Sequence, residues 1–187
     1  MGRKRASTDP GITGTYDIST GTAEVVPDEF RDGAYILNVN SVPSSHIVLG
    51  EPEELEFEYM HWIAAAVEHL NTRPANKLRV THLGGAGCSL PRYFASRLPG
   101  SRHTVVELDA KLGELVRTLF DVPHSPTVKI RAGEARKETE GFLPASRDII
   151  IRDVFAGDKT PASLTTVEFF QAAKQALEPG GVNFRLE

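Results

Sequence analysis

Glycines and an acid follow two apolar runs in the middle of the chain, in an order typical of a nucleoside site. Residues 80–83 lead into Gly84, Gly85 and Gly87, and a second apolar run ends in Glu107. In parallel sheets a glycine-rich turn lets a ligand approach the backbone, and an acid about 20 residues further on binds ribose hydroxyls. We therefore predict that the three glycines cradle a nucleoside and that Glu107 binds its ribose.

The same turn indicates which nucleoside is held. The dinucleotide fingerprint has a third glycine, which lets helix and strand approach closely over a pyrophosphate, and Leu90 stands at that position. The replacement argues for a smaller ligand, such as an adenosyl-sulfur compound, and makes NAD-dependent redox chemistry the least favoured reading. A turn of this kind can also be only a tight connection between strand and helix, and that reading stays open.

Two further acids follow predicted strands, where ligands of parallel sheets gather. Glu134 is placed to accept from an adenine amino group, or alternatively to cap the next helix. Asp153 precedes residues 154–161, which have the composition of a lid, and could hold a sulfonium near an amine and accept the proton of that amine. Asp109 fits the N-terminus of a helix better than a ligand.

Composition excludes several classes of function. A net charge of -4 and a pI near 5.9 disfavour a nucleic-acid-binding surface. No apolar run approaches the roughly 20 residues that span a bilayer, and no signal peptide is apparent, so we expect a cytoplasmic protein without a membrane partner. The single cysteine, Cys88, excludes an internal disulfide, and the scattered histidines predict no metal site.

The pattern of apolar residues predicts two domains after a disordered tail over residues 1–12. Residues 13–50 read as an antiparallel β-domain that packs on the next domain or on a partner subunit. Residues 51–187 read as a Rossmann-like nucleoside-binding domain. It stops soon after its last strand begins, so we expect it to be truncated at its C-terminus.

Within the second domain, strands and helices alternate after a helix at 55–70. This alternation predicts an α/β fold with a doubly wound, mostly parallel sheet, because neighbouring parallel strands need crossover helices to connect them. The predicted strands are 78–83, 102–107, 127–131 and 147–152, and the predicted helices are 89–98, 110–120, 134–141 and 163–177.

The order of these motifs resembles the spermidine synthases, or polyamine aminopropyltransferases. The resemblance is carried by residues 55–59, 83–87, 105–109, 133–135, 153 and 177–181. It implies a class I methyltransferase-like sheet and a homodimer formed with the N-terminal strands. It also implies transfer of an aminopropyl group from decarboxylated S-adenosylmethionine to putrescine or a similar amine, with release of methylthioadenosine. No tightly bound cofactor is expected.

The resemblance also implies roles for single residues. Glu107 would bind ribose, Glu134 would stand where the family places an adenine-binding Asp, Asp153 would be the catalytic acid position, and Tyr59 would contact substrate. Asp158 is the next acid after Asp153 and would contact the substrate as well.

The chain departs from the family pattern mainly in the contacts to the amine. Gly87 replaces an Asp of the glycine-rich loop, Met60 replaces a Gln or His, and Ser44 replaces a Gln. After Asp153 the usual Ser-Ser-Asp is Val-Phe-Ala at 154–156. The nucleoside half of the site is therefore better preserved than the amine half.

Two alternatives remain beside aminopropyl transfer. A methyltransferase that uses intact S-adenosylmethionine would need donors for the methionine carboxylate, which the backbone amides of residues 87–89 could supply at a helix start. A catalytically silent dimeric scaffold of the same fold would explain the missing amine contacts.

Overall fold

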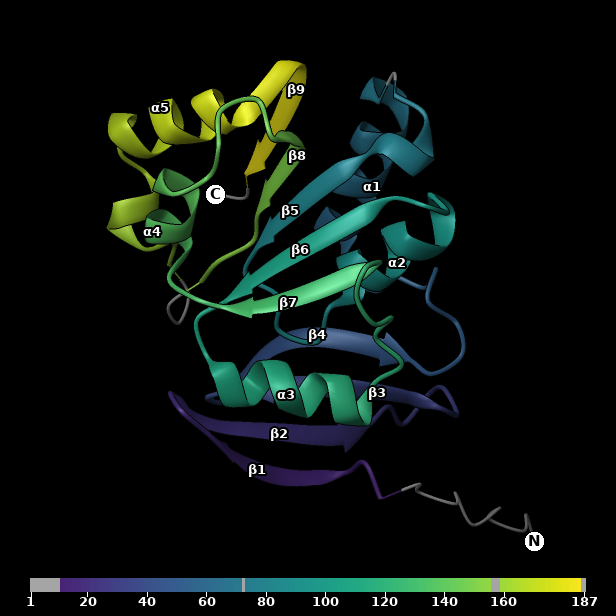
Figure 1. Ribbon diagram of the computed structural model, residues 1–187. Helices are drawn as coiled ribbons and strands as arrows, with labels where there is room; N and C mark the ends of the chain where they lie inside the picture. Colours follow the sequence, from purple (N-terminus) through teal and green to yellow (C-terminus); the bar gives the residue numbers. More distant parts are fainter. Residues whose placement is uncertain (1–10, 72, 156–158, 186–187) are drawn as a thin grey trace, which may run out of the picture.

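The computed structural model describes residues 11–71, 73–155 and 159–185, which form two β-sheets with helices between and above them (Figure 1). The first sheet is antiparallel and its strands follow one another in chain order. Its strands are β1 (Gly14–Ile18), β2 (Gly21–Pro27), β3 (Ala34–Val39) and β4 (Val42–Val48).

Alternating burial explains why this small sheet docks on the rest of the chain. In β2, Ala23 and Val25 are buried while their neighbours are exposed, as expected of a strand with one face in a core. These side chains share one apolar cluster with Leu37 and Ile47 of the same sheet and with Leu112 beyond it. The predicted β-domain is therefore built on the second domain and shares its core.

The second sheet is parallel throughout, in the order β7-β6-β5-β8-β9. The strand order reverses between β5 and β8, which is where a doubly wound sheet opens a crevice for ligands. Its strands are β5 (Arg79–Leu83), β6 (Arg102–Glu107), β7 (Val128–Ala132), β8 (Arg147–Arg152) and β9 (Leu177–Arg185).

Helices cover both faces of this sheet (Figure 1). Helices α4 and α5 lie on one face, α1 and α2 lie on the other, and α3 lies between the parallel sheet and the N-terminal sheet. The helices are α1 (Glu58–Leu70), α2 (Ser89–Arg97), α3 (Ala110–Leu119), α4 (Ala135–Glu140) and α5 (Val167–Ala176), with 3-10 turns η1 (Ala75–Lys77) and η2 (Ala162–Leu164).

The predicted fold class is confirmed, and the differences lie at element ends. Helix α1 begins at Glu58, three residues later than predicted, after an extended Phe57. Helix α5 begins at Val167 because Thr166 caps it, its side chain accepting a hydrogen bond from the Phe169 amide. Leu177, predicted to be helical, opens β9.

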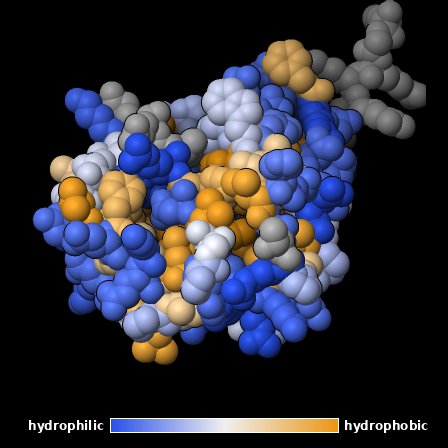
Figure 2. All heavy atoms as spheres, turned by 90° about the horizontal axis from the view of Figure 1, so that it is seen from above, coloured by the Kyte–Doolittle hydropathy of each residue, from blue (hydrophilic) through white to orange (hydrophobic). Residues whose placement is uncertain are grey.

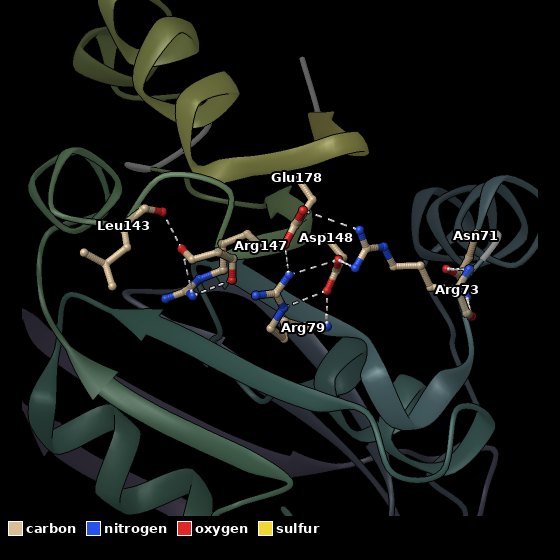
Figure 3. A network of polar contacts seen from close by, with 8 residues as sticks. Asn71, Arg73, Arg79, Leu143, Arg147, Asp148 and Glu178 are labelled. Atoms are coloured by element: carbon tan, nitrogen blue, oxygen red, sulfur yellow. Dashed lines mark hydrogen bonds and ion pairs between the residues drawn. The ribbon is translucent and has the colours of Figure 1, made fainter.

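An ion-pair network lies at the N-terminal ends of the strands of the parallel sheet (Figure 3). Asp148 is buried at the start of β8 and accepts from the Arg79 side chain and backbone, while Arg73 approaches its other oxygen. Glu178 pairs with both arginines. The network ties the N-terminal ends of β5, β8 and β9 together, remote from the carboxyl ends where the site lies.

Among the described strands β9 pairs only with β8, so its outer edge is open. Figure 2 shows that apolar side chains gather in the middle of the face seen from above, within a hydrophilic surround. A hollow beside β9 is lined by Val67 and Leu70 of α1 and by Val182 and Phe184 of β9. Within the described ranges, no helix is long and apolar enough to cross a membrane.

Candidate active site

A cleft of about 910 Å³ opens at the carboxyl ends of β5, β6, β7 and β8. Its volume lies within the range of small-molecule sites. The start of α1 and the hairpin tips of the N-terminal sheet complete its wall. Among the residues predicted for the site, the cleft is lined by Tyr59, Gly84, Gly85, Glu107, Glu134 and Asp153.

Gly84 lets β5 and β8, the strands between which the strand order reverses, come into close contact at their carboxyl ends. Its φ is +84°, and a Cβ atom there would lie 2.1 Å from the carbonyl oxygen of Asp153. Gly85 is restricted as well, because a Cβ atom would lie 2.5 Å from Cγ1 of Val105. Only glycine fits either position, so the turn is packed against β6 and β8 whether or not a ligand is bound.

Glu107 ends β6 and holds the glycine-rich turn. Its Oε2 accepts from the amides of Gly85, at 3.1 Å, and Ala86, at 3.3 Å, and its Oε1 accepts from the Asp109 amide at 3.1 Å. The residue is half-buried and lines the cleft. Because each carboxylate oxygen has two lone pairs, the three amides leave one lone pair, on Oε1, for a hydroxyl group.

Asp109 ties the two sheets together from the N-terminus of α3. Its Oδ1 accepts from the Leu112 amide at 3.0 Å and its Oδ2 accepts from the Thr20 amide, in the β1–β2 turn, at 2.6 Å. Burial alone would raise the pKa of Asp109, but these backbone hydrogen bonds outweigh it and lower the pKa to about 2. The predicted helix-terminal position of Asp109 is confirmed.

Glu134 caps α4 and also lines the cleft. Its oxygens accept from the amides of Arg136, at 2.9 Å, and Lys137, at 2.8 Å. The capping role predicted as the alternative is confirmed, and the exposed side chain also lines the cleft. A capping carboxylate can still accept a further donor, since these two bonds leave lone pairs unused.

Asp153 and Tyr59 meet in the cleft from distant parts of the chain. The Tyr59 hydroxyl, at the start of α1, donates to Oδ2 of Asp153, after β8, at 3.2 Å. Burial raises the pKa of Asp153 to about 6, and the bond from Tyr59 opposes this in part. Burial and the charge of Asp153 raise the pKa of Tyr59, which stays a donor. A carboxylate with this pKa can act as a base near neutral pH.

Gly87 lies behind the cleft and does not line it, unlike the cradle predicted from the sequence. Its amide donates to the Ser45 hydroxyl of β4 at 2.9 Å, and a Cβ atom there would lie 2.7 Å from Cβ of Ser45. The residue is small because the N-terminal sheet docks directly on the start of α2. The neighbouring Cys88 is buried, which raises the pKa of its thiol to about 12.

Most of the wall that the N-terminal sheet supplies is not predicted by the sequence pattern. Ser44 was noted only for its departure from a family pattern, whereas Thr20, Asn40, Pro43 and Ser45 also line the cleft. Their contribution depends on how the two sheets dock, which no local pattern encodes. Asp158 lies outside the described residues. Within those residues, no cluster of His, Cys, Asp and Glu could hold a metal ion.

The chain is similar in sequence and fold to several known proteins. The chain is 51% identical to a probable spermidine synthase from Corynebacterium glutamicum, with a TM-score of 0.88 over 92% of this chain and 63% of that one. It is 28% identical over 134 residues, 71% of this chain, to the polyamine aminopropyltransferase of Vibrio vulnificus. The chain is a diverged member of the spermidine synthase family.

The wider comparisons concern the fold and the extent of the match. Human methyltransferase-like protein 13 superposes with a TM-score of 0.60 at 22% identity, over 68% of this chain and 64% of that one, which shows the shared fold alone. No protein-family model matches the chain. The chain spans about half the length of the curated relatives it matches, 44% of the protein from Vibrio vulnificus.

Proposed function

We propose that this spermidine synthase family member transfers an aminopropyl group from decarboxylated S-adenosylmethionine to an amine such as putrescine. The observation that carries the proposal is the Tyr59–Asp153 pair, 3.2 Å apart, in a cleft beside the glycine-rich turn. The charged side chains of the described lining are all carboxylates. Such a lining favours a cationic sulfonium and a cationic amine together.

The nucleoside half of the cleft supports the proposal. Glu107 is fixed by three backbone amides, and the one lone pair left, on Oε1, suits a hydroxyl of the ribose. Glu134 stands at the end of the next strand, where it would accept from an adenine amino group. Gly84 and Gly85 let the nucleoside approach the backbone between them.

The reaction itself is an in-line displacement. The amine nitrogen forms a bond to the carbon next to sulfur, the C–S bond breaks, and its electron pair stays on sulfur as methylthioadenosine leaves. Because the bound amine is cationic, it first gives one proton to Asp153, whose pKa of about 6 leaves it ionised at neutral pH; the freed lone pair then forms the N–C bond, and the secondary ammonium that results keeps its charge. Because sulfonium is already a good leaving group, positioning supplies most of the rate enhancement.

Methyl transfer from intact S-adenosylmethionine is less well supported. Its carboxylate would need donors, and the described lining of the cleft contains neither Lys nor Arg. Two of the three backbone amides expected to serve are already used, since Gly87 donates to Ser45 and Cys88 donates to the Gly85 carbonyl at 2.6 Å. The decarboxylated donor carries no such group, so it fits the cleft better.

Calorimetric titration and turnover test the proposal together. Methylthioadenosine should bind more tightly than S-adenosylhomocysteine or NAD, and putrescine should strengthen its binding. With decarboxylated S-adenosylmethionine and an amine, wild-type protein should release methylthioadenosine, whereas Asp153→Asn should bind the nucleoside and release none. Asp32→Asn, an exposed position on the β2–β3 turn, is the matched control and should behave as wild type.

Two results would overturn the proposal. Tighter binding of S-adenosylhomocysteine would favour methyl transfer, and absence of binding to any nucleoside would favour a silent scaffold. The oligomer is a separate part of the proposal: we expect a homodimer formed with the N-terminal strands, which sedimentation velocity would detect.

A further inference from the structure

The cleft is lined by a buried histidine that the proposed reaction does not use. His82 lies near the end of β5, is 2% exposed and belongs to the lining of the cleft. Its ring centroid lies 6.3 Å from that of Phe94 in α2. Because buried polar atoms need hydrogen-bond partners, each ring nitrogen of His82 has to be accounted for.

The sheet register places His82 between the nucleoside half and the amine half of the cleft. Its register partner is Val105 on β6 and Ile151 on β8. Glu107 and Asp153 each lie two residues beyond these partners, on the same face of the sheet. Neighbouring strands are about 4.8 Å apart and two residues span about 6.6 Å, so the Cα atom of His82 lies roughly 8 Å from that of either acid.

Contacts with the covering helices show that the His82 and Asp153 side chains share this face. The Asp153 amide donates to the Leu83 carbonyl at 2.9 Å, so the ladder between β5 and β8 continues past the end of β8. The Asp153 side chain then accepts from Tyr59 of α1, and α1 covers the same face of the sheet as α2, which packs on His82 (Figure 1). Gly84, which follows β5, has no side chain to cover the imidazole ring.

One ring nitrogen of His82 is used within the protein. Its Nε2 lies 3.1 Å from Nδ1 of His103, whose Nε2 lies 2.7 Å from the Ser101 hydroxyl. That hydroxyl donates to the Leu98 carbonyl at 2.6 Å, so it accepts from His103, and His103 in turn accepts from Nε2 of His82. The proton of His82 is therefore on Nε2 and its lone pair is on Nδ1, and the bond to His103 fixes the orientation of the ring.

The other ring nitrogen, Nδ1, is available as an acceptor. Within the described ranges, no group of the chain is hydrogen-bonded to it. Burial, assisted by the neighbouring His103 ring, lowers the pKa of His82 well below its ordinary value, and burial lowers the pKa of His103 to about 4. Both rings are thus neutral at neutral pH, so Nδ1 can accept a hydrogen bond without competing with Asp153 for a proton.

We infer that His82 is a further substrate contact of the transfer reaction and that its Nδ1 accepts an N–H of the attacking amine. The inference rests on the proposed function and adds a residue to its amine site. One proton of the primary ammonium passes to Asp153, while a second N–H stays on Nδ1 and holds the nitrogen as the freed lone pair turns to the carbon beside sulfur. The N–C bond then forms as the C–S bond breaks, and His82 neither gains nor loses a proton.

Two substitutions separate the two ring nitrogens of His82. His82→Asn keeps an acceptor oxygen near the position of Nδ1 and loses the bond to His103, whereas His82→Gln keeps a donor near the position of Nε2 and loses the acceptor. With saturating decarboxylated S-adenosylmethionine, kcat and KM for putrescine are measured by methylthioadenosine release. We expect His82→Gln and His82→Leu to lower kcat/KM for the amine roughly tenfold or more, and His82→Asn to stay within about threefold of wild type.

Methylthioadenosine binding, measured by calorimetry without amine, is the second readout. Because the inferred contact is to the amine, the dissociation constant of methylthioadenosine should change by less than about threefold in all three variants. The matched control is His69→Leu, which removes an exposed imidazole from α1 and should leave both readouts at their wild-type values.

Three results would overturn the inference and leave aminopropyl transfer standing. A wild-type kcat/KM in His82→Leu would show that the ring does not contact the amine. A larger loss in His82→Asn than in His82→Gln would assign the ring to its bond with His103. Loss of methylthioadenosine binding in His82→Gln would assign it to the packing of the cleft. Absence of methylthioadenosine release by the wild-type protein with any amine would instead refute the transfer reaction itself.

Discussion

The hydrogen bond from Tyr59 to Asp153 should set the pH at which the protein becomes active. Burial raises the pKa of Asp153 to about 6, and the tyrosine hydroxyl, 3.2 Å away, opposes that rise by stabilising the ionised form. Tyr59→Phe removes the hydroxyl and keeps the ring. The pKa of Asp153 should therefore rise further, and the acidic limb of the pH profile should move to higher pH.

The size of the shift in the pKa of Asp153 follows from the strength of its hydrogen bond with the Tyr59 hydroxyl. Hydrogen bonds to charged groups contribute about 1.5 to 3 kcal/mol, and a long bond belongs at the lower end of that range, which corresponds to a shift of about 1 pH unit. Near pH 6 the wild-type carboxylate is about half ionised, while that of the variant is ionised to about one tenth. Activity at that pH should fall roughly fivefold more than near pH 9, where both are ionised.

The assay compares kcat/KM of both proteins from about pH 5 to 9 with one amine at constant ionic strength. Taking the ratio of the two proteins cancels the ionisation of the amine itself. The ratio also distinguishes a shift in the pKa of Asp153 from a loss of substrate contact, because a lost contact lowers activity equally at every pH. Methylthioadenosine binding by calorimetry is the control for folding. An unmoved acidic limb, or one moved to lower pH, would refute this account of Asp153.

Three further predictions test single contacts. Asp153→Asn should raise the free energy of unfolding near pH 8 by about 2 to 3 kcal/mol. The folded carboxyl holds its proton up to its pKa of about 6 and the unfolded one only to about 4, so wild-type stability falls as pH rises through this window. Urea denaturation should therefore show that the gain vanishes below about pH 4. Glu107→Ala should weaken methylthioadenosine binding by roughly a hundredfold in calorimetry, and a change below threefold would remove it from the ribose site. Gly84→Ala should lower the free energy of unfolding by about 2 kcal/mol more than Gly180→Ala in the same denaturation experiment. Both glycines have a φ of +84°, but only at Gly84 would a Cβ atom meet a carbonyl oxygen. Equal losses of unfolding free energy in the two variants would contradict the packing argument.

Periodicity was enough to predict the strands of the parallel sheet. The centre of β8 is a run of three isoleucines, and such a run, short and apolar on both faces, has few interpretations other than a buried strand. Helix starts were predicted less well, because an apolar residue that precedes a helix contributes to the same pattern as one inside it. Leu55 fits the helical face of α1, although the helix begins only at Glu58, after an extended Phe57.

The roles of single glycines could not be predicted from the turn itself. Gly84, Gly85 and Gly87 look alike in the sequence, yet a Cβ atom would meet β8 at the first, β6 at the second and the N-terminal sheet at the third. Only the third contact depends on another domain. The pairing of Tyr59 with Asp153 is hidden for the same reason, because residues at the two ends of the domain meet only once the sheet is assembled.

Two aspartates of one cleft show how the fold separates binding from proton transfer. Asp109 accepts from backbone amides, which stabilise its charge and lower its pKa to about 2. Among the described residues no backbone amide donates to Asp153, and burial raises its pKa to about 6. Asp109 thus stays ionised at any physiological pH and serves as a fixed cap between the sheets. Asp153 can take up and release a proton near neutrality, which is the property that a base for an attacking amine requires. The distinction comes from position, because Asp109 precedes a helix whose free amides face it, whereas Asp153 follows β8 and accepts from the Tyr59 hydroxyl.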